Sequence, residues 1–317
     1  MQRVTPLHHS PDHLEYTPTV VTTMGNVIEV TAMEKMPIGG CCIKLDADSY
    51  MDVRTGEVRM YNHGDSRADS IRSIKRTLTV IRAVINSNVT IPANVRWVTL
   101  TYAENMTDPK RLYHDWDKFW KRFLYWNTKN GHGRPKYISV IEPQGRGAWH
   151  VHAFFIWDHK APYIDNNAVM AKLWGHGFTS TQAVKDVDNI GAYFSAYLAD
   201  IPLDKVADLP EVDREALLHD APIEEKTFTD DAGAQHTKKF VKGARLHFYP
   251  VGMNILRTSR DVVDPIVEKM TFADAMKKVD SLKPTFSKSY AVLDDDGNTV
   301  NTITKVYYNI KRPQNQA

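Results

Sequence analysis

The sequence predicts an α+β fold in which helices pack on an antiparallel sheet with a split β-α-β core, flanked by β-rich extensions. Two observations support this prediction. Between residues 96 and 200, segments with strand and helix periodicity follow the order strand, helix, strand, strand, helix, strand, helix. A short connection containing proline and glycine joins the second and third strands, which favours a hairpin. In this arrangement the first and third strands are central neighbours in the sheet.

The composition is that of an ordinary globular protein, with 317 residues, 42% hydrophobic and 25% charged. The 40 basic and 38 acidic residues nearly cancel, so any site for a polyanion depends on local clustering. No apolar run approaches the ~20 residues that span a bilayer, and the start lacks the apolar core of a signal peptide. The only cysteines, Cys41 and Cys42, are adjacent, which excludes a disulfide framework and a cysteine zinc site. These features predict a cytoplasmic protein without membrane contact.

Residues 1–90 are expected to form an N-terminal extension with hairpins and a basic helix. The proline-containing segment 1–18 is predicted to be a loosely ordered arm, and a hairpin is expected to turn at Gly25. Apolar residues recur at helical spacing over residues 69–87, with a basic stripe on an adjoining arc. Such a stripe can contact a phosphate backbone or simply face solvent. It consists of Arg72, Lys75, Arg76 and Arg82.

Residues 91–200 are expected to form the core. Asp108 as N-cap and Pro109 at the first helical position begin a helix whose aromatic stripe is predicted to pack against the sheet. Asp188 is expected to cap the last helix, which ends near residue 200. The predicted strands of this core are residues 96–102, 136–142, 148–157 and 178–184.

A candidate metal centre lies on the third of these strands. Alternation places His150 and His152 on one face, and the connection after Glu142 is suited to fold this carboxylate back beside them. Two imidazoles and one carboxylate leave open positions on a divalent cation, which is typical of a catalytic site. These ligands suit Mg2+ or Mn2+, with Zn2+ as a competitor.

The last helix of the core supplies a second candidate group. Tyr193 and Tyr197 are four residues apart and share one side of the helix. They lie at the edge of an apolar arc, so their rings can pack while their hydroxyls reach outward. Tyrosines at this spacing also occur simply as residues at the edge of a core.

Three segments together resemble the HUH endonuclease superfamily, and more narrowly the rolling-circle replication initiators (Rep proteins) of bacterial plasmids and single-stranded DNA phages. The segments are Thr99-Leu-Thr-Tyr102, the stretch from Glu142 to His152 with its His-Val-His sequence, and Tyr193-x-x-x-Tyr197, in the family's order. A looser similarity extends over about residues 40–262.

The resemblance implies an HUH/ferredoxin-like nuclease core that cuts one DNA strand by transesterification at an origin. A tyrosine hydroxyl attacks the scissile phosphate, leaving a 5′-phosphotyrosine and a free 3′-OH that primes synthesis. The metal, held by His150, His152 and Glu142, polarises the phosphate oxygens. The expected partners are single-stranded or hairpin origin DNA, a host helicase and a host DNA polymerase, since the chain has no Gly-x-x-x-x-Gly-Lys-Ser/Thr loop.

One position departs from the family's pattern. Relatives with two tyrosines often carry a lysine just before the second, where this chain has Ala196. Lys185 or Lys242 could supply that cation. Tyr197 is expected to be the principal nucleophile, because it lies nearer the centre of the apolar arc. Further candidate contacts to DNA phosphates are Arg146, Lys185 and Arg257.

Residues 201–240 are charge-rich and are expected to form a surface insertion or linker. A β-rich segment, 241–317, is expected to follow and to pack on the core. Its predicted elements are strands at 244–249 and 254–257, a helix near 262–280, and a hairpin of strands 290–293 and 302–308.

Other interpretations stay open. A relaxase or a transposase of the same superfamily would use the same chemistry, although relaxases usually place the tyrosine before the histidine motif and single-tyrosine transposases are much shorter. A barrel amidohydrolase also uses His-x-His, but it needs repeated βα units and further ligands. A non-catalytic DNA-binding protein with a decayed site belongs to a different class again.

Overall fold

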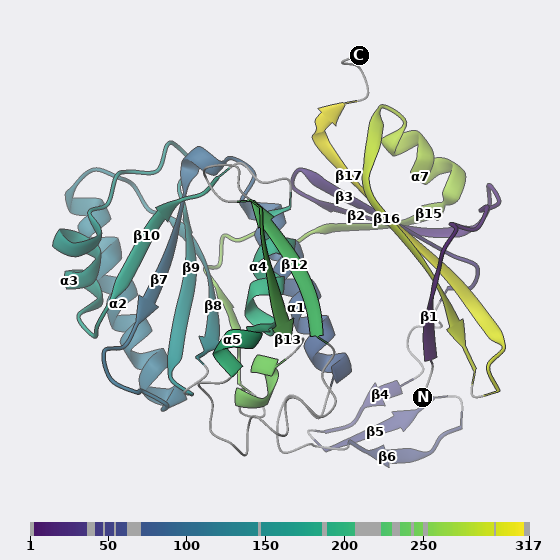
Figure 1. Ribbon diagram of the computed structural model, residues 1–317, viewed down its shortest axis with the longest axis horizontal. Coiled ribbons are helices and arrows are strands. Elements are labelled where there is room, and N and C mark those ends of the chain that lie inside the picture. The colour runs from purple at the N-terminus through teal and green to yellow at the C-terminus, as the bar shows by residue number, and fades with distance from the viewer. Residues whose placement is uncertain are drawn as a thin grey trace. The chain divides into compact units, whose positions relative to one another are not determined.

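The computed structural model describes residues 3–36, 42–46, 48–53, 55–61, 71–144, 147–185, 189–206, 223–229, 235–241, 244–249, 253–294 and 296–313. Contacts divide the chain into two units (Figure 1). One unit is formed by Met1–His63 together with Asp264–Ala317, and the other by Gly64–Val263. Each unit has its own sheet and its own hydrophobic core.

The second unit, Gly64–Val263, is built on a five-stranded sheet in the order β10-β7-β9-β8-β14. Strands β7 and β8 run parallel with β9 between them, because each pairs antiparallel with β9. The predicted pairing of the first and third strands is therefore confirmed. The strands are β7 Val95–Thr101, β8 Lys136–Pro143, β9 Trp149–Ile156, β10 Thr179–Ala183 and β14 Leu256–Thr258.

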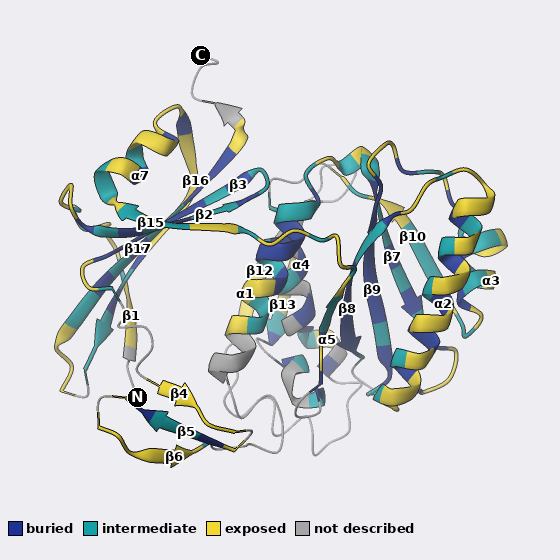
Figure 2. Cartoon of the chain, turned by 180° about the vertical axis from the view of Figure 1, so that it is seen from behind, coloured by how far each residue is buried: buried dark blue, intermediate teal, exposed yellow. Residues whose placement is uncertain are grey.

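Helices cover both faces of this sheet, and Figure 2 shows β8 and β9 buried over most of their length. Successive residues of β9 point to opposite faces. Phe155 packs on Phe123 of α2 with ring centroids 4.4 Å apart, so the aromatic stripe of α2 faces the sheet as predicted. Phe154 packs on Phe194 of α4, with centroids 5.1 Å apart. The helices are α1 Ile71–Asn88, a 3-10 turn Pro92–Asn94, α2 Pro109–Lys129, a π-helical turn Asn166–Met170, α3 Ala171–Trp174 and α4 Ile190–Ala199.

Two helix starts bear on the predicted caps. The Asp108 side chain accepts a hydrogen bond from the Lys110 N–H at 2.8 Å, and Pro109 is the first residue of α2, as predicted. Asp188 lies outside the described residues, and α4 is capped instead by Asn189, which accepts from the Ala192 N–H at 3.0 Å. Asn189 directly precedes the first helical residue, and its amide oxygen serves a cap as well as a carboxylate does.

The described residues of the predicted insertion 201–240 form a three-stranded sheet in the order β11-β13-β12. The predicted strand 244–249 is wrong, because Ala244–Phe248 is a 3-10 helix. Ala244 and Phe248 both pack on the cluster around Val241, and a spacing of four residues brings two side chains together on a helical turn rather than on a strand. The other elements here are β11 Ile201–Pro202, α5 Leu203–Val206, β12 Ile223–Thr229 and β13 Gln235–Val241.

The first unit contains a six-stranded antiparallel sheet in the order β1-β16-β17-β3-β2-β15. Its core forms where Val21 and Val30 of the sheet meet Ala275 and Val279 of helix α7. A second, three-stranded sheet is formed by β4, β5 and β6. The elements are β1 Arg3–Leu7, β2 Pro18–Met24, β3 Val27–Met33, β4 Cys42–Lys44, β5 Ser49–Asp52, β6 Val58–Met60, β15 Ile266–Thr271, α7 Phe272–Val279, β16 Leu282–Leu293 and β17 Thr299–Pro313.

This unit confirms both predicted hairpins, β2 with β3 and β16 with β17, and corrects two other predictions. The segment 1–18 is not a loose arm throughout, because β1 pairs with β16, a partner from the far end of the chain. Only Phe272–Val279 of the predicted helix 262–280 is helical, because the residues before it form strand β15 on the edge of β2. The division of the chain also differs from the expected boundaries at 90 and 240, since β17 pairs with β3 and α1 belongs to the second unit.

Among the described residues, no helix combines the length and the hydropathy needed to cross a membrane.

Candidate metal centre

Strands β8 and β9 bring Glu142, His150 and His152 together. Glu142 lies directly opposite His150 in the ladder, and His152 follows two residues later on the same face. One ligand atom from each side chain lies within 4.8 Å of those from the other two. Glu142 and His152 are buried, whereas His150 is half-buried. The structure thus gives the arrangement that the hairpin geometry predicts, while the role of these side chains as metal ligands stays a prediction.

The turn between the strands fixes this register. The Gln144 N–H donates to the carbonyl of Ala148 at 2.7 Å, and the Gly147 N–H donates to the carbonyl of Gln144 at 2.8 Å. Gly147 has φ +80°, a left-handed conformation that glycine adopts without strain. Arg146, a predicted phosphate contact in this turn, lies outside the described residues.

The neighbouring strand β7 orients the buried histidine. Thr99 lies opposite His152, and its Oγ1 is 3.1 Å from Nδ1 of the imidazole. The Nε2 atom of His152 then faces the Glu142 carboxylate, which it contacts. Burial lowers the pKa of His152 to about 4. The imidazole is therefore neutral near pH 7, which is the form that ligates metals.

Arg245 is a residue of this site that the sequence did not reveal. Its guanidinium forms an ion pair with the Glu142 carboxylate, and burial lowers its pKa. The 3-10 helix that carries Arg245 is tied to β8, because the Tyr249 hydroxyl donates to the carbonyl of Ile141 at 2.8 Å. No local pattern points to this arginine, since the contact joins segments far apart in the chain.

The donor set fits a divalent cation. Two imidazole nitrogens and one carboxylate oxygen converge, with room left in the coordination sphere for other ligands. The contact of Arg245 with Glu142 and that of Thr99 with His152 are the outer-shell interactions that orient ligating carboxylates and imidazoles. The arrangement does not distinguish among Mg2+, Mn2+ and Zn2+.

Helix α4, which carries Tyr193 and Tyr197, packs directly on the strand that holds the histidines. The ring of Phe194 lies 5.6 Å from that of His152 and 5.6 Å from that of Trp97, centroid to centroid. Phe194 is fully buried, so it anchors the helix beside the metal centre. The side chains of Tyr193 and Tyr197 lie outside the described part of the structure, and their role stays a prediction.

The predicted DNA contacts are spread over several elements. Arg76 is exposed on α1 and Arg82 is half-buried there, while the side chains of Arg72 and Lys75 lie outside the described residues. Lys185 is exposed just after β10. Arg257 on β14 is directed to the α2 side of the sheet, where it pairs with Asp117 at 3.1 Å, so it is not brought together with the metal centre.

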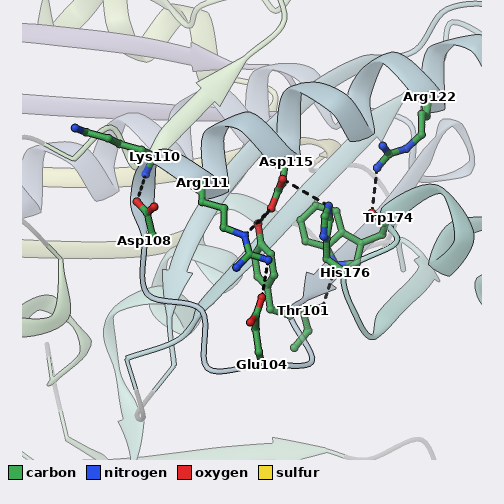
Figure 3. Close-up of polar contacts among 10 residues, drawn as sticks. Thr101, Glu104, Asp108, Lys110, Arg111, Asp115, Arg122, Trp174 and His176 are labelled. Carbon is green, nitrogen blue, oxygen red and sulfur yellow. Dashed lines mark hydrogen bonds and ion pairs between the residues drawn. The ribbon is translucent and has the colours of Figure 1, made fainter.

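On the α2 side of the sheet a buried carboxylate organises a polar network (Figure 3). Asp115 accepts a hydrogen bond from the Tyr102 hydroxyl at 3.1 Å and lies 3.5 Å from Arg111 Nε and 3.6 Å from His176 Nε2. Arg111 also pairs with Glu104 at 2.6 Å. Burial and the charge of Asp115 raise the pKa of Tyr102, which keeps this hydroxyl protonated as a donor. The network ties the segment after β7 to the turn after α3.

A model of the replication-associated protein family ORF2 matches residues 95–201. The match begins at the first residue of β7 and ends just after α4, so it covers the candidate metal centre and the helix with the two tyrosines. No curated protein and no solved structure matched the chain. The family match supports a role in the initiation of rolling-circle replication, and therefore DNA binding.

Proposed function

We propose that this chain is a DNA-nicking replication initiator of the HUH type, which cleaves and rejoins one strand at an origin for rolling-circle replication. The observation that carries the proposal is the joint placement of two groups. Glu142, His150 and His152 converge on β8 and β9, and the buried ring of Phe194 holds helix α4 against the same strand. The family match over this segment adds independent support.

The geometry assigns a role to each group. When bound by Glu142, His150 and His152, a divalent cation would polarise the oxygens of the scissile phosphate and stabilise charge in the transition state. The tyrosine hydroxyl, with Tyr197 as the principal nucleophile and Tyr193 for a second transfer, forms the new bond to phosphorus. The bond from phosphorus to the 3′ oxygen breaks, and the proton lost by the tyrosine ends on that oxygen. The products are a 5′-phosphotyrosine and a free 3′-OH, which a DNA polymerase can extend.

Covalent attachment conserves the energy of the phosphodiester bond, so strands can be rejoined without ATP. Arg245 would hold one oxygen of Glu142 and leave the other for the cation. The parallel pair β7 and β8, with β9 between them, is consistent with a split β-α-β core. Strand separation is assigned to a host helicase.

The test uses 3′-labelled single-stranded oligonucleotides tiled along the gene and its flanking DNA, incubated with Mg2+, Mn2+ or EDTA. Denaturing gels should show label attached to the protein only with a metal ion, since the 5′ end of the downstream fragment becomes linked to tyrosine. A His150→Ala/His152→Ala double variant and Tyr197→Phe should lose most of the adduct. Tyr163→Phe is the matched control, because this tyrosine is 82% exposed and removed from the site.

Adduct that persists in the double variant, or in EDTA, would refute the metal assignment. If Tyr193→Phe loses the adduct and Tyr197→Phe does not, the roles of the two tyrosines are reversed. If neither reduces it, the nucleophile is a different residue and the tyrosine mechanism is wrong.

A further inference from the structure

The sheet face that carries the metal ligands continues onto the edge strand β10. The Thr101 N–H donates to the carbonyl of Phe178 at 2.9 Å, and the Ala103 N–H donates to that of His176 at 2.9 Å. These bonds keep the register of the β10–β7 pair, so Phe178 lies opposite Thr101 just before β10 begins. Thr101 in turn lies opposite His150, and His150 opposite Glu142.

Phe178 therefore belongs to the same row across the sheet as two of the metal ligands. Directly opposed residues of antiparallel strands point to the same face. Neighbouring strands are ~4.8 Å apart, which places Phe178 two strands, or about 10 Å, from His150. Alternate residues support this orientation, because Thr179 and Thr181 both donate to Asn166 Oδ1 on the opposite face, at 2.9 and 3.2 Å.

This part of the face is open. Phe178 is 73% exposed, Gln182 is exposed, and Ser180 is half-buried. The Gln182 side chain donates to Ser180 Oγ at 3.2 Å, which shows that these two polar groups share one side of β10. With Thr101 and Thr99 on β7, they form a strip of neutral hydrogen-bonding groups beside the metal centre.

The exposed ring is nevertheless carried on a fixed segment. The turn before it is held by the His176–Asp115 ion pair at 3.6 Å and by Trp174 Nε1, which donates to the carbonyl of Thr101 at 3.0 Å (Figure 3). At Gly177 an added Cβ would lie 2.5 Å from that carbonyl oxygen and 2.8 Å from the carbonyl carbon of Tyr102. The backbone of the turn is thus in close contact with β7. A rigidly mounted phenyl ring that remains exposed is suited to receive a flat ligand.

We propose that Phe178 stacks on an unpaired base of single-stranded DNA next to the scissile phosphate, and that the polar strip on β7 and β10 binds the same strand. This inference rests on the proposed function and names the surface that receives its substrate. Single-stranded DNA is favoured over duplex because only an unpaired, unstacked base offers its face to an aromatic ring.

Binding can be separated from cleavage by working in EDTA. The probe is a fluorescein-labelled mixed-sequence oligonucleotide of about 20 nucleotides, longer than a typical single-strand site, followed by fluorescence anisotropy. Phe178→Ala should weaken binding about 5- to 150-fold, the loss expected for one stacked base, and Phe178→Trp should retain it. Tyr125→Ala is the matched control, because Tyr125 is 69% exposed on α2, on the other side of the sheet. A second probe carries 2-aminopurine, whose fluorescence should be quenched by the wild-type chain and not by Phe178→Ala.

Unchanged binding by Phe178→Ala, or equal weakening by Tyr125→Ala, overturns the stacking role. Absence of single-strand binding by the wild-type chain overturns it as well. Failure of the proposed function has a different signature, namely normal binding by the wild-type chain without any metal-dependent covalent adduct.

Discussion

The junction between helices α1 and α4 offers a test in which the sign of the stability change is informative. Gly191, in the first turn of α4, lies against α1. An added Cβ would be 2.8 Å from Asn86 Oδ1 and 3.0 Å from the carbonyl carbon of Arg82. Neither position can move freely, because Asn86 Oδ1 accepts from the Gly191 N–H at 2.8 Å and the Arg82 carbonyl belongs to the helix backbone.

The magnitude follows from two opposed effects. Replacing glycine by alanine in a helix normally stabilises it by up to about 1 kcal/mol. Here the new methyl group would push the helices apart, and overpacking of this kind typically costs about 1–3 kcal/mol. Loosening the buried Asn86–Gly191 hydrogen bond costs about 1 kcal/mol more. Gly191→Ala should therefore destabilise the protein by about 1–3 kcal/mol overall.

Urea titration and thermal melting measure this loss, with an expected fall of about 2–4 °C in Tm for each kcal/mol. Ala192→Gly, at the next position of α4, is the matched control and should lose about 1 kcal/mol through helix propensity alone. Covalent adduct formation should fall in Gly191→Ala beyond the loss of folded protein, because α4 carries both tyrosines. A variant more stable than wild type would show that the two helices are not in close contact, and would refute the reasoning.

Two further predictions concern charge. Arg245→Met leaves the buried Glu142 carboxylate without its ion-pair partner, which should cost about 3–5 kcal/mol without metal, and Mn2+ should restore more stability than it gives the wild type; an equal fall in Tm with and without Mn2+ would count against the assignment. Changing Arg72 and Arg76 to Gln should flatten the dependence of log K for DNA on log salt by roughly one to two units if α1 contacts phosphates, and an unchanged slope would make its basic stripe a solvated face.

The sequence by itself determined those features that depend on neighbours along the chain. Side-chain alternation in residues 149–156 placed both histidines on one face, and the turn chemistry of the hairpin placed Glu142 beside them. The cap at Asp108 and the buried stripe of α2 followed from short-range rules of the same kind. These features involve few residues with strong local preferences, which is why the candidate metal centre could be predicted before its geometry was known.

Tertiary structure alone decided the contacts between distant segments. The ion pair of Arg245 with Glu142, the pairing of β17 with β3, and the row that joins Phe178 to His150 have no local signature. A strand carries the same alternation whichever strand it pairs with, and a 3-10 turn of five residues resembles a short strand in its apolar pattern. Pairing partners and buried charges are selected by the packing of the whole unit, because a side chain is stabilised by what surrounds it in space rather than by its neighbours in sequence.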